Sequence, residues 1–528
     1  MARVLTNNTS LRVATETSIG VLPGTPQWTV VEFDTIGAYG AVLTTTVRRP
    51  ISQDRGRKKG TVTNLESSVE YDTDLTFEAF RLFAEGFMFS EFTNVEFNLR
   101  ATTGTVPPPA VAAGGVFTID AASTLLAGKM QYGAATVQTL LFAKGYTNAV
   151  NNGLHVLAAD VAGTNTSVDV STVLVDETPP SNATLEVCGI RTDDLTMAIS
   201  GSTLTLTSAA DLNWTTIGLT VGQEIHIGSM DVSGVVQNAY DDGGTDDVYG
   251  YARITAITAT VLSCDKIDPI IAAASGSSPF SPETIDIMFG NFLRDVAVTA
   301  DSDDTRYLER TFQFEAVFPD LGGIGTDQYE YAIGNFANEL SFNFPLQDKS
   351  TVNFGFIGTN ADDITGTRKT GASTAKSPLR NTAFNTSSDV QSLTTDLISS
   401  VSDVCFKSLT LTARNNVSPE YCLGTLGATF VNAGLFEVDV EGQMLFTSAS
   451  IINAIKNNTT VTFASIFRNE DGAIAYDIPE ATASGGGREY PLDQSVLVNL
   501  VLQAFTSDTF GYSMGISLFP AVPGVLSS

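Results

Sequence analysis

The residues that could carry out chemistry are few and scattered. The chain has two histidines, His155 and His226, and four cysteines among 528 residues. A Ser/His/Asp or Cys/His site needs a histidine beside its nucleophile, and neither histidine has a neighbourhood that suggests one. The motifs GxxxxGK[ST], HExxH and CxxC are absent. We therefore expect no catalytic residues, no cofactor and no bound metal, and hence no enzyme.

An aspartate-rich turn and the histidines are the remaining candidates for a metal site. The turn contains Asp241, Asp242, Asp246 and Asp247. It lacks the ligand spacing of known calcium loops, so a solvated turn explains it better. Each histidine lies alone on a predicted strand, which favours a half-exposed strand residue over a metal ligand.

The cysteines are too few to form a disulfide framework. Cys405 and Cys422 flank a predicted strand and turn, so the two thiols could meet. We prefer the interpretation that they are reduced thiols in the core, because free cysteine behaves as a small apolar residue.

One basic cluster stands out in an acidic chain, whose formal net charge is −30. Its members are Arg48, Arg49, Arg55, Arg57, Lys58 and Lys59. A solvated loop would explain the cluster, and so would an electrostatic contact with an acidic surface of a neighbouring subunit. A nucleic-acid patch fits less well, because no aromatic residues are interleaved. The net charge also argues against binding DNA through its phosphates, although an acidic wall would let DNA pass.

The composition favours a mainly β protein of several domains. Charged residues make up only 16% of the chain, and Thr, Ser, Val and Gly are abundant. No apolar run reaches the 18 residues that a membrane-spanning helix needs, so we expect no membrane association.

The stretch 435–467 predicts a strand, a short helix and a second strand. Val438 and Val440 alternate with acidic residues, which is the period of a half-buried strand. Ile451, Ile452 and Ile455 then form one apolar helix face.

A similar strand–helix unit is predicted far upstream. A strand ends near Tyr71, Asp74 or Thr76 caps a helix, and the helix is expected to close at Gly86. Its apolar face contains Phe77, Phe80, Phe83 and Phe87. Two such units indicate one fold used twice.

The remaining segments suggest domain boundaries. We expect a first β-sandwich or barrel domain with a flanking helix in residues 1–100 and 301–358, interrupted by a β-rich insert in residues 101–300. Within the insert, residues 128–178 and 212–268 are similar and predict a pair of small β-domains. Residues 359–403 are polar and predict a linker or arm, and residues 404–528 predict a second domain like the first. A hairpin is expected in the first domain, with Leu340, Phe342 and Phe344 opposite Val352, Phe354 and Phe356.

Four passages, in this order, resemble the tail tube proteins of long-tailed (siphovirus-like) bacteriophages. They are ETSIGVLPGTPQW at 16–28, the hairpin and helix at 49–80, RTFQFEAVFPDL at 310–321 with the hairpin to 358, and SLTLTARNN at 408–416 with LGTLGA at 423–428 and the stretch 435–467. None is a catalytic signature; the passages are patterns of strand, turn and glycine.

The resemblance implies a structural virion protein with two tube domains. Subunits of the family join their sheets side by side into rings, which stack into a tube that conducts DNA during ejection. Two tube domains per chain then imply a homo-oligomer of trimeric rings with pseudo-sixfold symmetry. The implied partners are the tape measure protein and other tail proteins, with DNA passing unbound. The insert would decorate the outside of the tube, and the basic cluster would contact the next ring.

Two other functions would explain parts of the sequence. A secreted or surface adhesin that binds glycans would explain the acidic β-rich insert, but it would not explain the duplicated unit or the opening residues, which we expect not to be an export signal. A carbohydrate-active enzyme of the virion would need aromatic platforms, and the chain has only two tryptophans.

Overall fold

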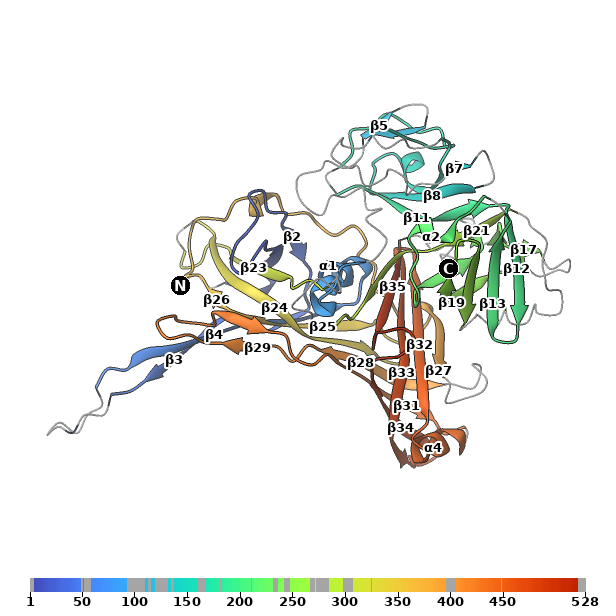
Figure 1. Cartoon of the computed structure of the whole chain (residues 1–528). Coiled ribbons are helices and arrows are strands. Elements are labelled where there is room, and N and C mark those ends of the chain that lie inside the picture. The colour runs from blue at the N-terminus through green and yellow to red at the C-terminus, as the bar shows by residue number, and fades with distance from the viewer. Residues whose placement is uncertain are drawn as a thin grey trace.

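The structure, a computed structural model, describes most of the chain. The described residues are 4–48, 51, 58–92, 110–112, 115–118, 132–133, 137–159, 167–180, 182–209, 211–230, 236–241, 247–265, 271, 284–297, 307–323, 325–395, 405–447 and 449–520. Within them the fold is mainly β, as the composition predicts, and most strands lie in two antiparallel sheets (Figure 1).

The larger sheet has 16 strands and contains both predicted strand–helix units. Its strands are β1 (Ser10–Thr15), β2 (Thr29–Val31), β3 (Thr35–Thr46), β4 (Thr61–Asp74), β22 (Asn291–Arg294), β23 (Thr311–Phe318), β24 (Gln328–Phe344), β25 (Thr351–Gly358), β26 (Asn360–Ala361), β27 (Val390–Thr395), β28 (Phe406–Arg414), β31 (Glu437–Leu445), β32 (Thr460–Asn469), β33 (Gly472–Glu489), β34 (Leu497–Ala504) and β35 (Gly515–Phe519).

The two units have the same strand connections. In the first, β3 pairs with β4, β4 with β25, β25 with β24, and β24 with β23. In the second, β28, β31, β34, β33 and β32 pair in the same succession. One helix follows β4 and another follows β31, at the same point of each unit. The duplication inferred from two strand–helix segments therefore extends over the whole unit.

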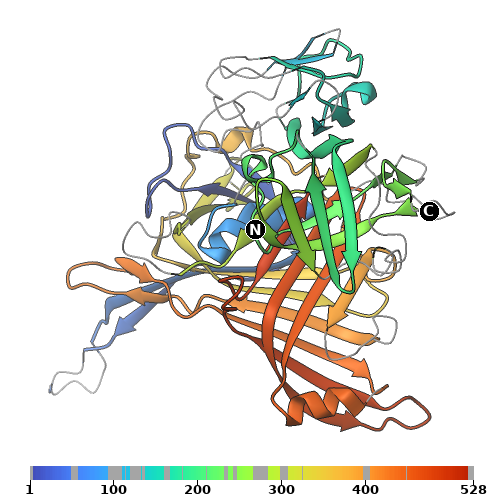
Figure 2. The ribbon, with the colours of Figure 1, turned by 45° about the vertical axis from the view of Figure 1, so that its right-hand side comes forward.

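A single strand pair joins the two units into one wall. The end of β24, from Glu339 to Phe344, pairs with β28 from Arg414 to Leu409. The strands β3, β4, β25, β24, β28, β31, β34 and β33 consequently form one continuous surface, which curves across the molecule in Figure 2.

The first helix, α1 (Phe77–Met88), packs its phenylalanines into the largest core. Thr76 caps it as predicted: the Ala79 amide donates to the Thr76 hydroxyl at 3.2 Å. The prediction that the helix closes at Gly86 was wrong, since it continues to Met88 and ends with Phe89 in the left-handed conformation. Gly86 instead permits close packing, because a Cβ there would lie 2.6 Å from the Phe312 ring.

The second helix, α4 (Ala449–Lys456), was predicted correctly. Ile451 and Ile452 are buried, and Asn458 adopts a positive φ just after the helix end. The hairpin of β24 and β25 was also predicted correctly, with Phe342 opposite Val352 and Leu340 opposite Phe354.

The insert forms a ten-stranded sheet with its own core. Its strands are β7 (Tyr132–Gly133), β8 (Val137–Lys144), β9 (Gly153–Val156), β11 (Thr184–Thr192), β12 (Leu195–Ser200), β13 (Thr203–Ser208), β14 (Glu224–Ile227), β19 (Gly250–Ile257), β20 (Val261–Asp265) and β21 (Ile285–Met288). Strands from both passages predicted as repeats lie in this one sheet, connected through β11 and β21.

Short elements complete the fold. They are β5 (Ala110–Ala112), β6 (Val116–Thr118), β10 (Ser167–Asp169), α2 (Trp214–Ile217), β15 (Ser229–Met230), β16 (Val236–Gln237), β17 (Tyr240–Asp241), β18 (Asp247–Val248), β29 (Ser418–Glu420) and β30 (Phe430–Asn432). Among the described residues, no helix has the length and hydrophobicity needed to cross a membrane.

The described part of the predicted linker, up to Thr395, packs closely on the body. The Trp28 indole donates to the Thr370 carbonyl at 3.1 Å, and Phe384 is fully buried. The segment ends in β27, which pairs with β32.

Candidate functional site

The wall has one exposed face, and its rows can be followed through the strand register. Directly opposite residues of paired strands lie on the same face. One row joins Glu70, Gly355, Glu339, Arg414 and Glu437. The row therefore crosses from the first unit into the second, and three of its five residues carry carboxylates.

The next two rows are also acidic. One contains Asp72, Asn353, Ser341, Thr412, Asp439 and Gln503, and the other contains Asp74, Thr351, Asn343, Thr410, Glu441 and Val501. Arg414 is the one cation in these three rows, and it is balanced by Glu339 at 3.5 Å and Asp439 at 3.1 Å. The face thus presents a surplus of negative charge to whatever lies against it.

The acids recur at equivalent positions of the two units. Asp74 pairs with the first residue of β25, and Leu445 pairs with the first residue of β34. Since β25 and β34 are equivalent strands, Asp74 corresponds to Leu445. Counting back along the strands, Glu70 corresponds to Glu441 and Glu66 to Glu437. Both units therefore place carboxylates at equivalent positions of the same face.

The wall ends in two unpaired strand edges. Within the described residues, β3 pairs only with β4. In β33, the pairing with β32 ends at Thr482, and residues 483–489 pair with β34 on one side only. On their other side these residues have no strand partner among the described residues. The equivalent edges inside the chain, on β28 and β24, are paired with each other. Unpaired edges of this kind are templates for joining another chain.

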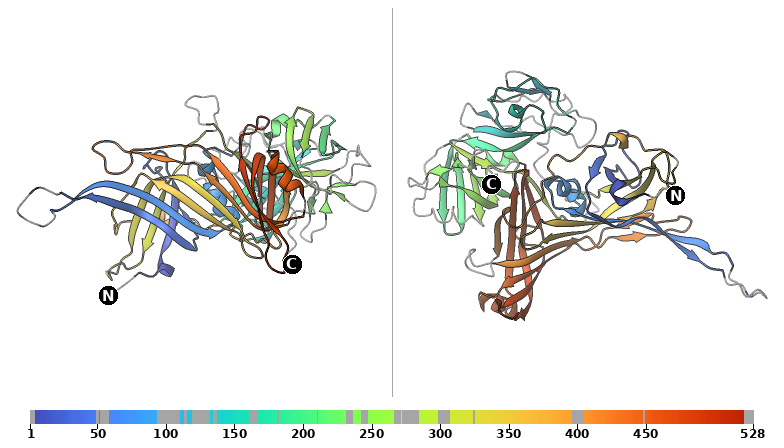
Figure 3. Two further views of the ribbon diagram at one scale, coloured as in Figure 1. Left: turned by 90° about the horizontal axis from the view of Figure 1, so that it is seen from below. Right: turned by 180° about the vertical axis from the view of Figure 1, so that it is seen from behind.

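The described members of the predicted contact cluster lie beyond the paired ends of β3 and β4, which form a hairpin. This hairpin projects from the body on the side away from the insert (Figures 1 and 3). Arg48, Lys58 and Lys59 are exposed. The other three members, Arg49, Arg55 and Arg57, lie outside the described residues. The assignment of the cluster to an inter-ring contact stays a prediction.

The candidate metal and thiol residues are placed differently from the predictions. His155 and His226 are 2% exposed, so the expectation of half-exposed residues was wrong. Among the described residues no group of His, Cys, Asp and Glu side chains could hold a metal ion; of the aspartate-rich turn, Asp242 and Asp246 lie outside them. Cys405 and Cys422 are free and exposed rather than in the core, because they lie just outside the ends of β28 and β29.

Buried ion pairs, which the sequence analysis missed, fasten the insert to the wall. Glu186 of the insert accepts from Arg81 of α1 at 2.6 Å and from Arg380 at 3.3 Å. Arg253 of the insert pairs with Asp477 of β33 at 3.0 Å. Burial raises the pKa of Asp477, although Arg253 opposes this effect. These partners are far apart in the sequence, so no local pattern announces them.

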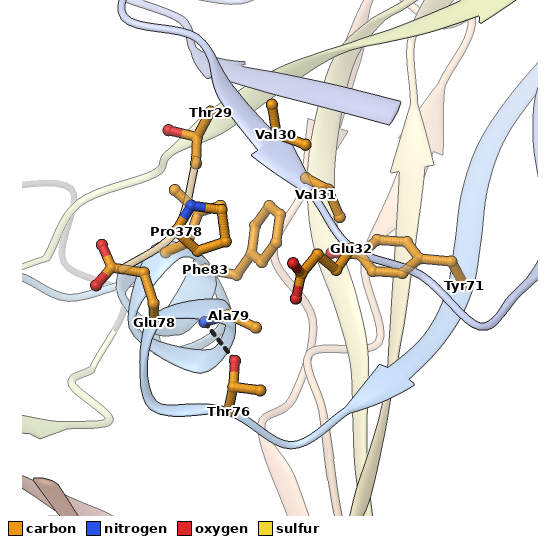
Figure 4. Close-up of a pocket in the computed structure, with 11 residues that line it drawn as sticks. Thr29, Val30, Val31, Glu32, Tyr71, Thr76, Glu78, Ala79, Phe83 and Pro378 are labelled. Carbon is orange, nitrogen blue, oxygen red and sulfur yellow. Dashed lines mark hydrogen bonds between the residues drawn. The ribbon is translucent and has the colours of Figure 1, made fainter. Parts of the chain in front are cut away.

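A small pocket beside α1 offers no further site. It lies between β2 and the helix N-terminus, where Phe83, Val31 and Pro378 face one another (Figure 4). Its volume of about 20 Å³ has room for roughly one water molecule. The acidic face and the two edges are therefore the features that could carry function.

Part of the chain matches a known protein family. Residues 268–498 match the family model described as "Phage tail tube protein". The matched range runs from the end of the insert through β33 and includes the β24–β28 pair. No curated protein matches the chain.

His226 generates a pH prediction, because burial lowers its pKa to about 4. The unfolded chain, with an ordinary histidine pKa near 6.5, then binds one more proton between pH 6.5 and about 4. The contribution of the buried, neutral His226 to the free energy of unfolding is complete above pH 6.5. It falls by about 3 kcal/mol as the pH drops from 6.5 to about 4. His226→Gln should lessen this loss when the free energy of unfolding is measured at pH 7 and pH 4.5. An equal loss in both proteins would contradict the assignment.

Proposed function

We propose that this chain, whose residues 268–498 match the phage tail tube protein family, assembles as stacked rings into a tube of the two-tube-domain type found in long-tailed phages. The tube is a structural part of the virion tail, and its lumen conducts the genome during ejection. The observation that carries the proposal is the β24–β28 pair, which joins two equivalent units while the two outer edges of the same kind stay open.

Repeating this joint between chains closes a ring. The open edge of β33 on one copy pairs with β3 of the next, as β24 pairs with β28 within the chain. Three copies then supply six equivalent units, which gives a trimeric ring with pseudo-sixfold symmetry. Closure pairs both outer edges of the wall, so the ring gains hydrogen bonds that no isolated copy can make.

The acidic face lines the lumen in this arrangement. It lies on the side of the wall opposite the buried phenylalanines of α1, whereas the insert is fastened to α1 itself through the Arg81–Glu186 pair. The tube domains (1–100 with 301–358, and 404–528) form the wall, and the insert (101–300) decorates the outside. Carboxylates in the lumen repel phosphates and leave DNA free to slide.

Stacking of the rings is assigned to the basic cluster. The projecting β3–β4 hairpin carries these cations toward the acidic surface of the next ring. The tape measure protein and other tail proteins are the partners expected of such a tube.

The first prediction concerns assembly. The purified chain should form rings or tubes with a threefold modulation in negative-stain electron microscopy. Because ring closure pairs both open edges, the rings should persist on dilution more than a single-edge dimer would. A stable monomer that binds glycans would contradict the proposal and favour a surface adhesin.

The second prediction concerns the lumen. Glu70→Lys with Glu441→Lys replaces equivalent acids by cations, so assembled tubes should retain short duplex DNA at low salt and release it at high salt. The readout is cosedimentation of labelled DNA. Asp193→Lys with Asp211→Lys makes the same charge change on the insert and should retain much less DNA. Equal retention by the two variants would contradict the assignment of the acidic face to the lumen.

The third prediction concerns stacking. Reversing the charge at Arg55, Arg57, Lys58 and Lys59 to Glu should leave rings intact but shorten the tubes, because the contact between rings is then repulsive. Tube length is measured on electron micrographs. Tubes of unchanged length would rule out the stacking role.

A further inference from the structure

An apolar cavity opens beside the unpaired edge of β3. Its volume is about 370 Å³, and its walls come from the segment before β1, the start of β3 and the end of β23. Phe33, Tyr39 and Phe318 are the aromatic side chains among its lining residues. A space of this size beside an open strand edge raises the question of what fills it.

The second unit shows what fills the equivalent place. The pairs β23–β24 and β32–β33 have a register shift at the same point, which is Phe312/Phe314 in the first unit and Val461/Phe463 in the second. Counting four residues on from Phe314 and from Phe463 makes Phe318 equivalent to Phe467. Phe467 is covered by Phe344, the last residue of β24. Their rings stack with centroids 4.4 Å apart and planes at 12°. Phe344 is 5% exposed. The joint between the units thus inserts one aromatic side chain into the neighbouring unit.

Tyr490 is the residue of the second unit that corresponds to Phe344. Residues 344–358 read FPLQDKSTVNFGFIG, and residues 490–504 read YPLDQSVLVNLVLQA. The turns also share their geometry, with φ of 56° at Gln347 and 59° at Asp493. No neighbouring unit follows the second one within the chain, and Tyr490 is accordingly 72% exposed.

A second pair of positions points to the same contact. Two residues before Phe344, Phe342 packs on Tyr476 of the second unit, with ring centroids 5.0 Å apart. Their equivalents are Arg488 and Glu330. Arg488 is exposed. Glu330 is half-buried beside the cavity, because its backbone carbonyl accepts a hydrogen bond from the Tyr39 hydroxyl at 2.9 Å. Among the described residues no ion pair involves its carboxylate. Burial raises the pKa of Glu330. An aromatic pair inside the chain is thus replaced by opposite charges.

We propose that Tyr490 of one copy enters the cavity of the next copy and stacks on Phe318, while Arg488 of the first copy pairs with Glu330 of the second. The proposal rests on the ring assembly proposed above and names its contact residues. The charged pair also distinguishes the joint between copies from the joint within a copy. If β33 of one copy paired with β28 of another, Arg488 would lie against Tyr476. If β24 of one copy paired with β3 of another, Glu330 would be buried against Phe342 without a cation beside it. Both mismatched joints are therefore disfavoured.

Cysteine cross-linking tests the contact directly. In a background of Cys405→Ser and Cys422→Ser, one variant carries Phe318→Cys and a second carries Tyr490→Cys. Co-assembly followed by mild oxidation should give a disulfide-linked dimer on a non-reducing gel, and either variant alone should give none. Intact wild-type rings without a dimer band in the mixture would overturn the proposal and leave the ring assembly standing.

A charge exchange provides the second test. Arg488→Glu and Glu330→Arg should each raise the protein concentration needed for rings by about tenfold or more, and the two changes together should restore it. Tyr490→Ala should weaken assembly similarly, because an aromatic anchor is lost, whereas Tyr490→Phe should not. Leu492→Ala is the matched control, since Leu492 is 88% exposed and its equivalent Leu346 stays exposed in the internal joint.

The outcomes separate the two proposals. Wild-type protein that never forms rings overturns the ring assembly and this contact with it. Rings that form equally well from wild type, Tyr490→Ala and Arg488→Glu overturn the contact alone. Weakening by these variants, with restoration in the double variant, supports it.

Discussion

The fold depends on the pairing of one strand edge from each unit with an edge of the other. Within the chain the end of β24 lies against β28, and this one joint turns two equivalent units into a continuous wall. At the outer ends of the wall lie the equivalent strands, β33 for β24 and β3 for β28. Their corresponding edges have no partners among the described residues. A single repeated joint accounts for both the internal connection and the proposed assembly, because the equivalent edges have equivalent geometry.

Charge is distributed according to the two sides of this wall. The exposed face repeats its carboxylates in both units, whereas the core side is apolar around α1. Buried ion pairs join the insert to α1 and to β33. Glu186 holds two arginines, and Arg253 holds two aspartates. Removing one partner of such a pair leaves an uncompensated buried charge, which costs about 3–5 kcal/mol. The insert is therefore fastened to the wall by specific contacts rather than joined only by its chain connections.

The sequence predicted the parts of the fold that local patterns determine. The phenylalanine spacing of α1, the isoleucine face of α4 and the hairpin of β24 and β25 are all set by residues close together in the chain. The acidic rows were not predicted, because Glu70, Glu339 and Glu437 become neighbours only through strand pairing. The polar composition of residues 359–403 concealed Phe384 and Arg380, which are buried. The shared Pro-Leu turns at Pro345 and Pro491 were visible in the sequence and would have revealed the full extent of the duplication.

A three-dimensional reconstruction of assembled rings by electron cryomicroscopy tests the central claim most directly. The account predicts that residues 483–489 of one copy pair with β3 of the next, in the arrangement that β24 and β28 adopt within each copy. Three copies should then form one closed sheet with the acidic rows facing the lumen. Rings in which β3 stays unpaired, or in which copies meet through the insert, would contradict it.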